Sequence, residues 1–152
     1  MAILRLPLVA GTNPPGNLNK MINGLASNRY LSIGNGQARK SIVLGTDVAA
    51  IILAAAHKGG VFNLTDGYHP TLSELEKLIS SQLNMNPPRS IPLWMARALG
   101  KIGDVLGSRV PINSAVIEKL TSSLTFSDVA AREQLGWSPN PVLENFNIFA
   151  EE

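Results

Sequence analysis

The chain has 152 residues, of which 45% are hydrophobic and 16% are charged, a balance that predicts one folded domain and excludes a disordered chain. The lack of cysteine excludes disulfides, thiolate zinc sites and cysteine nucleophiles, and the longest apolar run, 48–56, is far shorter than the roughly 20 residues of a membrane span. A net charge of only +2, scattered basic residues and 5% aromatic residues argue against nucleic-acid binding, and the lack of a secretion signal favours a cytoplasmic protein.

The first half of the chain alternates predicted strands and helices. In chain order these are a strand over 3–9, a helix over 17–25, a strand over 30–33, a strand over 41–44, a helix capped by Thr46 and stopped by the glycine pair 59–60, and a strand over 61–64. Because the first strand begins almost at residue 1, we expect either a truncation or a sheet that is completed by another segment. The glycines at 34–36 are interpreted as a β-hairpin turn, since a dinucleotide loop needs a third glycine and a following helix.

The second half is predicted to be mostly helical. The pattern Thr71-x-x-Glu74 is a capping box for a helix that reaches Leu83. Further helices are predicted over 92–107, 111–120, 127–136 and 140–149, the last with Val142, Phe146 and Phe149 along one face. The predicted fold class is therefore α/β, with partial Rossmann-type sheet strands followed by a mainly helical cap.

Few residues carry chemistry by their spacing alone. The two histidines, His57 and His69, lack the helical partner that a metal site would need, so no metal ligand is predicted. Arg39 and Lys40 follow the glycine turn and would suit a diphosphate, although a solvated strand end explains the pair better on spacing alone. Asn17 is an ordinary helix cap, and the free amide groups of that helix start also suit an anion or a polar sugar.

Several segments, taken in order, resemble the C-terminal half of the extended short-chain dehydrogenases that act on nucleotide sugars, the NAD-dependent epimerase/dehydratase family. They are ILRLPLVAG, PPGNLNKMINGL, GNGQARKSIVLGTDVAA, GGVFNLTD and AREQLGWSP. The resemblance implies that residues 1–152 form a substrate-binding portion and that an N-terminal NAD(P)-binding portion lies outside the chain. The family's Tyr-x-x-x-Lys pair has no match, because Tyr30 and Tyr68 are followed four residues later by Gly34 and Leu72. We therefore expect no catalytic residue, no bound cofactor and no activity in this chain alone.

The same resemblance implies where the ligand groups would lie. Asn17 and Leu18 would meet the nucleotide diphosphate, and Leu31 and Ile33 would lie against the base. Lys40 stands where the family has an arginine and would pair with a phosphate, with Arg39 sharing that task. Arg109 would add a second cationic contact from the cap. The resemblance also implies that the nicotinamide and the sugar would be contacted by Leu6, Pro7 and Leu8.

The implied function is the nucleotide-sugar-binding portion of an NAD(P)-dependent nucleoside-diphosphate-sugar epimerase or dehydratase, an isomerase or oxidoreductase. The segment SRVPINSAVIEKLTSSLTFS resembles a branch from polysaccharide biosynthesis, which includes C4 epimerases and C4 ketoreductases that act on UDP-N-acetyl sugars. The implied partners are a nucleoside-diphosphate sugar, the missing Rossmann portion with NAD or NADP, and, as one option, a second copy of the intact enzyme in a homodimer. An alternative is a non-catalytic, nucleotide-sensing relative of the same fold. A glycine-rich turn and a Tyr-x-x-x-Lys pair upstream would favour the enzyme.

Overall fold

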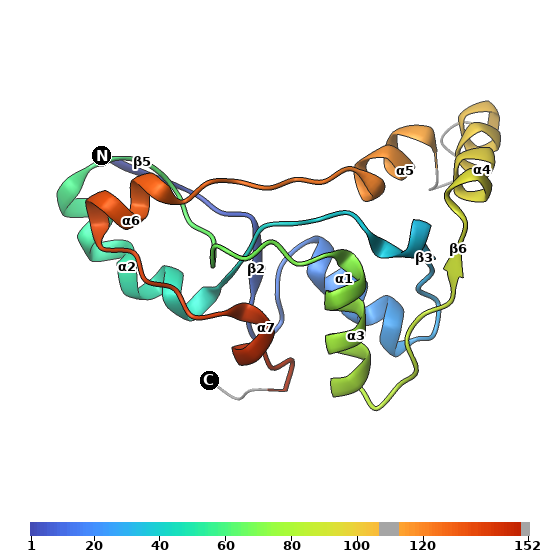
Figure 1. Cartoon of the computed structure of the whole chain (residues 1–152), viewed down its shortest axis with the longest axis horizontal. Helices are drawn as coiled ribbons and strands as arrows, with labels where there is room; N and C mark the ends of the chain where they lie inside the picture. The colour runs from blue at the N-terminus through green and yellow to red at the C-terminus, as the bar shows by residue number, and fades with distance from the viewer. Residues whose placement is uncertain (107–112, 150–152) are drawn as a thin grey trace.

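The computed structural model describes residues 1–106 and 113–149 and has a mixed α/β fold, which confirms the predicted class (Figure 1). The elements in chain order are β1 (Ala2–Arg5), β2 (Leu8–Ala10), α1 (Asn17–Ala26), β3 (Ser32–Ile33), the 3₁₀ turn η1 (Gly34–Gly36), β4 (Ile42–Leu44), α2 (Gly45–Lys58), β5 (Gly60–Asn63), α3 (Leu72–Gln82), β6 (Ser90–Ile91), α4 (Leu93–Leu106), α5 (Ser114–Thr121), α6 (Val129–Leu135) and α7 (Val142–Asn145).

The strands form three parallel pairs, β1 with β5, β2 with β4, and β3 with β6. Two predictions are corrected by this pairing. The single strand expected over 3–9 is two strands with different partners, and the break falls at Pro7, which has no N–H to donate to a ladder. The glycine turn at 34–36 is not a hairpin turn, because the strands on its two sides pair elsewhere.

Strand β4 separates two hydrophobic clusters because its side chains alternate between its two faces. Ile42 and Leu44 face a cluster built with β2, α1, α3 and α7, in which Leu18, Leu75, Ile79 and Val142 are buried. Val43 faces the other cluster, which contains Phe62, Leu64, Ala131 and Trp137. The Trp137 indole N–H also donates to the carbonyl of Thr65 at 2.8 Å, so the Leu-Gly-Trp segment is an internal packing anchor.

Some of the predicted helix boundaries are confirmed and others are wrong. The capping box is confirmed: the Glu74 amide donates to Thr71 Oγ1 at 3.2 Å, and the Thr71 amide donates to Glu74 Oε2 at 2.7 Å. Gly136 ends α6 in the left-handed conformation. Thr46, however, is not a cap, because α2 already begins at Gly45 and Leu44 occupies the N-cap position without a side-chain bond. The predicted helix end at 107 and the predicted helix start at 111 lie outside the described residues. Helix α5 begins at Ser114, with Asn113 as its N-cap.

The last predicted helix is also corrected, because α7 has only four residues. The Gln82 side chain explains the early end: its amide nitrogen donates to the carbonyl of Phe146 at 2.7 Å, and its amide oxygen accepts the N–H of Ile148 at 2.9 Å. These bonds satisfy main-chain groups that a longer helix would have used. Phe149 is consequently 64% exposed and does not face the core.

Much apolar surface remains exposed in this fold. Ile3 and Val61 on the β1–β5 pair are 44% and 48% exposed, and Leu53 on α2 is 73% exposed. A second exposed set lies on α4, at the opposite end of the long axis from α2 (Figure 1). None of the helices within the described ranges is long and apolar enough to cross a membrane.

Candidate functional site

The glycine turn η1 is packed tightly against the start of α3. Gly34, Asn35 and Gly36 all have positive φ angles, near +60°. A Cβ atom on Gly36 would lie 2.7 Å from the amide nitrogen of Ser73, so only glycine fits there. The Asn35 amide donates to Ser90 Oγ at 3.2 Å and the Ser90 hydroxyl donates to Asn35 Oδ1 at 3.1 Å. The turn therefore fixes the approach of the chain to Arg39.

Residues 39–41 are held between two other segments. The Lys40 amide donates to the carbonyl of Pro70 at 3.0 Å on one side. On the other side, the Leu124 amide donates to the carbonyl of Arg39 at 2.8 Å and the Ser41 amide donates to the carbonyl of Leu124 at 3.0 Å. The main chain of the basic pair is therefore part of a hydrogen-bonded layer, while the Arg39 side chain is exposed and Lys40 is half-buried.

The guanidinium of Arg39 lies over the turn that precedes α3. Its Nη1 donates to the carbonyl of His69 at 2.8 Å. The Tyr68 hydroxyl donates to Glu74 Oε1 at 2.7 Å. This bond lowers the pKa of Glu74 and raises that of Tyr68. The charge of Arg39 adds to the lowering for Glu74 and opposes the rise for Tyr68. Arg39 is exposed and has five N–H donors, so it can still bind an anion.

The ammonium group of Lys40 is held at the end of α5. Its Nζ donates to the carbonyls of Lys119 and Ser122, at 3.1 and 2.7 Å, where α5 ends and carbonyls lack helical partners. Partial burial and, secondarily, repulsion from Lys119 lower the pKa of Lys40. Two of its three N–H donors thus tie α5 to the entrance of β4. Sequence reasoning had no signal for this role, because 79 residues separate Lys40 from Lys119.

Asn17 and Leu18 occupy the first turn of α1 but differ in their exposure to solvent. Asn17 is exposed, and Gly16 rather than Asn17 takes the N-cap position, with φ 69° and no side-chain cap bond. Leu18 is 1% exposed and belongs to the core. A ligand at this helix start can therefore contact the Asn17 side chain and the main chain, but not the Leu18 side chain.

Leu31, just before β3, and Ile33 in β3 flank a buried polar group. Leu31 is 54% exposed and Ile33 is half-buried. Between them, Ser32 points inward to Glu76, which also accepts the Tyr30 hydroxyl at 3.1 Å. Burial raises the pKa of Glu76, although the bonds from Ser32 and Tyr30 oppose the shift, and burial next to Glu76 raises the pKa of Tyr30. This inward anchor fixes which way Leu31 faces.

The connection between β1 and β2 consists of Leu6 and Pro7, and Leu8 is the first residue of β2. Leu6 is 44% exposed, whereas Leu8 packs partly against the main core. The Leu8 amide donates to the carbonyl of Ser41 at 3.3 Å, so this segment lies directly beside the one that carries the basic pair. Arg109, the other cation implied by the sequence, lies outside the described residues.

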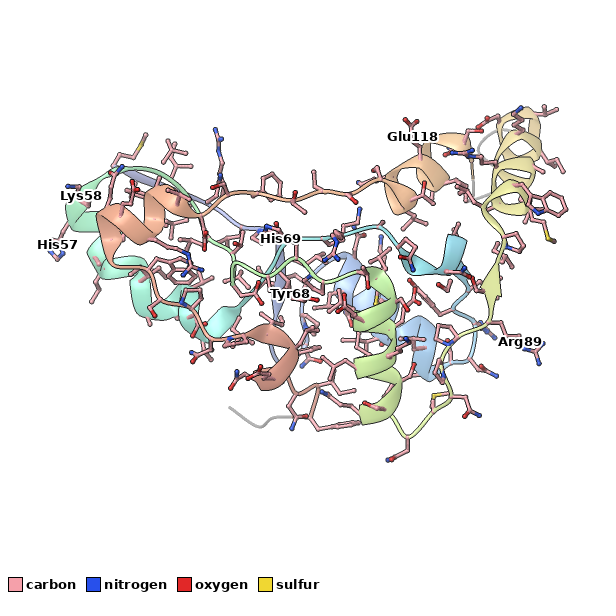
Figure 2. All side chains as sticks on the ribbon, in the orientation of Figure 1. His57, Lys58, Tyr68, His69, Arg89 and Glu118 are labelled. Atoms are coloured by element: carbon pink, nitrogen blue, oxygen red, sulfur yellow. The ribbon has the colours of Figure 1, made fainter. Side chains whose placement is uncertain are left out.

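The histidines do not come together. His57 lies in the last turn of α2 and His69 near the middle of the molecule (Figure 2). His69 Nδ1 is 3.1 Å from Ser41 Oγ, but Ser41 is only 1% exposed and its oxygen accepts the Phe126 amide, so this pair has no access to a substrate. In the described part of the chain, no three His, Asp or Glu side chains gather as metal ligands would.

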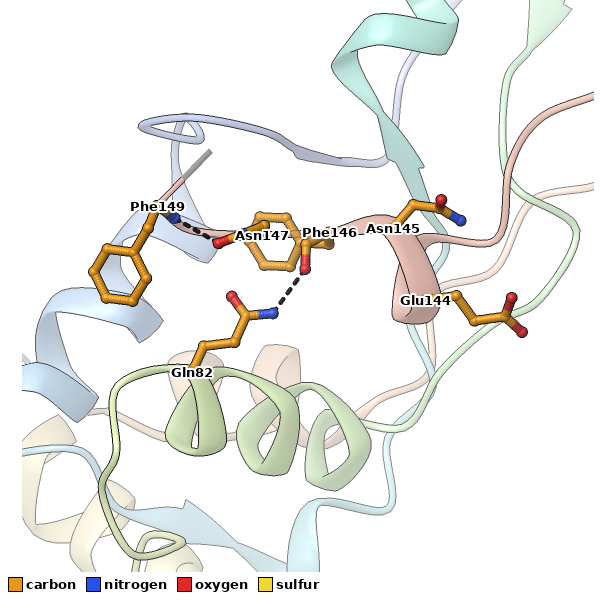
Figure 3. Close-up of a pocket in the computed structure, with 6 residues that line it drawn as sticks. All are labelled: Gln82, Glu144, Asn145, Phe146, Asn147 and Phe149. Atoms are coloured by element: carbon orange, nitrogen blue, oxygen red, sulfur yellow. Dashed lines mark hydrogen bonds between the residues drawn. The ribbon is translucent and has the colours of Figure 1, made fainter. Parts of the chain in front are cut away.

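Two surface hollows lie away from the basic pair. One, of about 580 Å³, is open and lined by Gln82, Glu144, Asn145, Phe146, Asn147 and Phe149 (Figure 3). The amide group of Gln82 there is already hydrogen-bonded to the main chain of Phe146 and Ile148. The other, of about 380 Å³, is lined by 28 and 84–89. It includes the exposed Arg89, whose carbonyl accepts the Ser32 amide at 3.0 Å, which places a cation near the predicted base-binding strand.

Comparison with known proteins defines the class of fold. No family model matches the chain. The uncharacterized Escherichia coli (strain K12) protein YbjS is 30% identical over 86 residues, which are 53% of this chain and 26% of YbjS.

The solved structures similar to this chain include nucleotide-sugar epimerases. Thermotoga maritima UDP-glucose 4-epimerase, crystallised with UDP-glucose, has a TM-score of 0.67 and 20% identity, over 97% of this chain and 43% of that one. Bacillus cereus UDP-N-acetylglucosamine 4-epimerase has a TM-score of 0.63 and 16% identity, over 95% and 42%. Bordetella bronchiseptica WbmG, crystallised with NAD and UDP, has a TM-score of 0.58 and 15% identity, over 91% and 39%. The chain thus has the fold of part of these enzymes and spans less than half of their length.

Proposed function

We propose that this chain is the nucleotide-sugar-binding, C-terminal portion of an NAD(P)-dependent nucleoside-diphosphate-sugar epimerase or dehydratase. One observation carries the proposal: 97% of the chain matches part of an epimerase that was crystallised with UDP-glucose. The hydrogen-bonded layer that brings Leu8 beside residues 39–41 supports it, because the two implied ligand-binding segments are neighbours.

In this proposal Arg39 is the principal cation for the diphosphate. It is exposed, and a guanidinium forms paired hydrogen bonds with phosphate oxygens. Lys40 contributes its remaining N–H donor, the Asn17 side chain and the main chain at Leu18 bind the diphosphate from the α1 side, and Leu31 and Ile33 contact the base. Arg109, which lies outside the described residues, is proposed as a further cationic contact from the cap.

The cofactor belongs to the remaining portion of the proposed enzyme, which supplies the glycine-rich turn and the Tyr-x-x-x-Lys pair. Leu6, 44% exposed at the break between β1 and β2, offers an apolar surface that suits one face of a nicotinamide ring. NAD or NADP supplies the hydride acceptor and donor when bound. The residues of this chain bind and orient the sugar nucleotide and exclude water, and the chain alone is proposed to be inactive.

The finer assignments are also proposals. The substrate is a UDP-N-acetyl sugar and the reaction is at C4, as an epimerase or a ketoreductase of polysaccharide biosynthesis in the cytoplasm. The likeness to an enzyme named as a UDP-N-acetylglucosamine 4-epimerase supports this choice. Product analysis of the intact enzyme with a panel of nucleotide sugars would decide the sugar and the reaction.

Calorimetric titration with UDP-glucose tests the binding role. Charge reversal in Arg39→Glu and Lys40→Glu is expected to weaken binding by about 1–3 kcal/mol, the scale of hydrogen bonds to charged groups. Lys58→Glu is the matched control, because Lys58 lies at the exposed end of α2 (Figure 2). Unchanged affinity in the Arg39 variant, or an equal loss in the Lys58 variant, would remove the basic pair from the site.

A further inference from the structure

Helix α4 buries its smallest residues and exposes its largest. Ala96, Gly100 and Gly103 are the buried positions and lie along one side of the helix, and Gly100 faces α5. A Cβ atom on Gly100 would lie 3.1 Å from the main chain of Ser114 and 3.2 Å from the Ile117 side chain. The contact with α5 is therefore a close approach of two helix backbones, which leaves no room there for the large apolar side chains of α4.

Five large apolar side chains of α4 are exposed to solvent. They recur at helical spacing, so they form one continuous face. The exposed fractions on this α4 face are 71% for Trp94, 40% for Met95, 49% for Leu99, 55% for Ile102 and 87% for Val105. The helix forms the end of the molecule opposite to α2 and the β1–β5 pair (Figure 1). Single exposed apolar residues are ordinary, but five on one helix indicate a surface that is covered by something else.

Two basic residues and one acidic residue lie beside the α4 face. Arg97 and Lys101 are exposed and lie four residues apart on one edge of it. The acidic residue on that side, Asp104, accepts the amide of Ser114 at 3.0 Å, so its carboxylate is engaged with the start of α5. Asp104 stays exposed and its pKa is lowered by the bonds from Ser114, so Arg97, Lys101 and Asp104 together leave a net positive charge on this edge.

We propose that the α4 face binds in the plane of an anionic lipid surface. An amphipathic helix with a basic edge and a tryptophan is suited to the boundary between headgroups and acyl chains. Its 14 residues are about 21 Å long, which allows it to lie in the interface but is too short to span a bilayer. The negative charge of the cytoplasmic leaflet complements Arg97 and Lys101.

A second copy of the chain fits this face less well. A stable dimer buries about 800 Å² on each partner, and one exposed helix face about 21 Å long and about 10 Å wide supplies only part of that. Two antiparallel copies of α4 would also bring two pairs of basic residues together. The lipid proposal does not rest on nucleotide binding, and either can fail alone.

Vesicle co-sedimentation of the whole chain tests the proposal. We expect the chain to sediment with vesicles of phosphatidylcholine and phosphatidylglycerol, and less with phosphatidylcholine alone. Trp94 emission should shift to shorter wavelength on binding, whereas the other tryptophan, Trp137, is already buried. Removing both charges in Arg97→Gln/Lys101→Gln should weaken binding to anionic vesicles about thirtyfold, from about 1 kcal/mol for each charge.

Val105→Glu places a charge on the α4 face and is expected to abolish sedimentation. Leu53→Glu is the matched control, because Leu53 is similarly exposed on α2 at the other end of the molecule, and it should bind as the unsubstituted chain does. The proposal is overturned if the unsubstituted chain stays in solution with anionic vesicles, if Leu53→Glu loses as much binding, or if light scattering finds a dimer that Val105→Glu dissociates.

Discussion

Substitution of the two glycines of η1 by alanine separates the cost of a positive φ from the cost of a close contact. Gly34 and Gly36 have almost the same φ, 58° and 61°. An added Cβ at Gly34 meets only Leu93 Cβ at 3.5 Å, an ordinary contact, whereas at Gly36 it lies 2.7 Å from the Ser73 amide nitrogen and 3.1 Å from its Cα. The left-handed conformation costs alanine about 1–2 kcal/mol at either position. Overpacking against a main chain adds about 1–3 kcal/mol at Gly36 only.

We therefore expect Gly34→Ala to lower the free energy of unfolding by about 1–2 kcal/mol and Gly36→Ala by about 2–5 kcal/mol. Urea denaturation followed by circular dichroism at 222 nm measures both values, provided that the slopes with urea agree. Because η1 sets the approach to Arg39, Gly36→Ala should also weaken UDP-glucose binding more than Gly34→Ala does. Equal losses of stability in the two variants would refute the close packing of the turn on α3.

Three further predictions concern residues around the turn. Glu76→Gln should flatten the pH dependence of stability: burial raises the pKa of Glu76 above 4.5, so its neutral form favours folding at low pH, and this contribution is lost as pH rises through the raised pKa. An unchanged slope in denaturation midpoints between pH 4 and 8 would contradict the burial of this carboxyl group. Lys40→Met should lower the free energy of unfolding by about 1 kcal/mol, measured by urea denaturation, because two carbonyls at the end of α5 lose their donor. Thr71→Ala should cost about 1 kcal/mol by the same measurement through loss of the α3 cap, and a cost near zero would show that the capping box is dispensable.

The sequence predicts local structure well where the signal is local. The capping box at Thr71 and the glycine that ends α6 depend on bonds within a few residues, and both are confirmed. The α/β class follows from alternating apolar patterns and is confirmed as well. The helix over 140–149 fails because a distant residue, Gln82, satisfies the main chain beyond Asn145 and lets the helix end early.

The features of the fold and site that the sequence does not predict depend on contacts between residues far apart in the chain. The turn at 34–36 has the composition of a hairpin, but its flanking strands pair with segments on either side of it in the chain. Lys40 is adjacent to Arg39, yet its ammonium group is committed to the end of α5. The Arg39 and Lys40 side chains therefore have unequal access to a ligand. That inequality comes from tertiary contacts alone.

A crystal structure of the chain with UDP-glucose is the most direct test of the proposed binding function. The account predicts that the diphosphate oxygens lie within hydrogen-bond distance of the Arg39 guanidinium and face the first turn of α1, with the base against Leu31. A ligand bound elsewhere, for example in the hollow beside Gln82, with Arg39 free of contact, would contradict it.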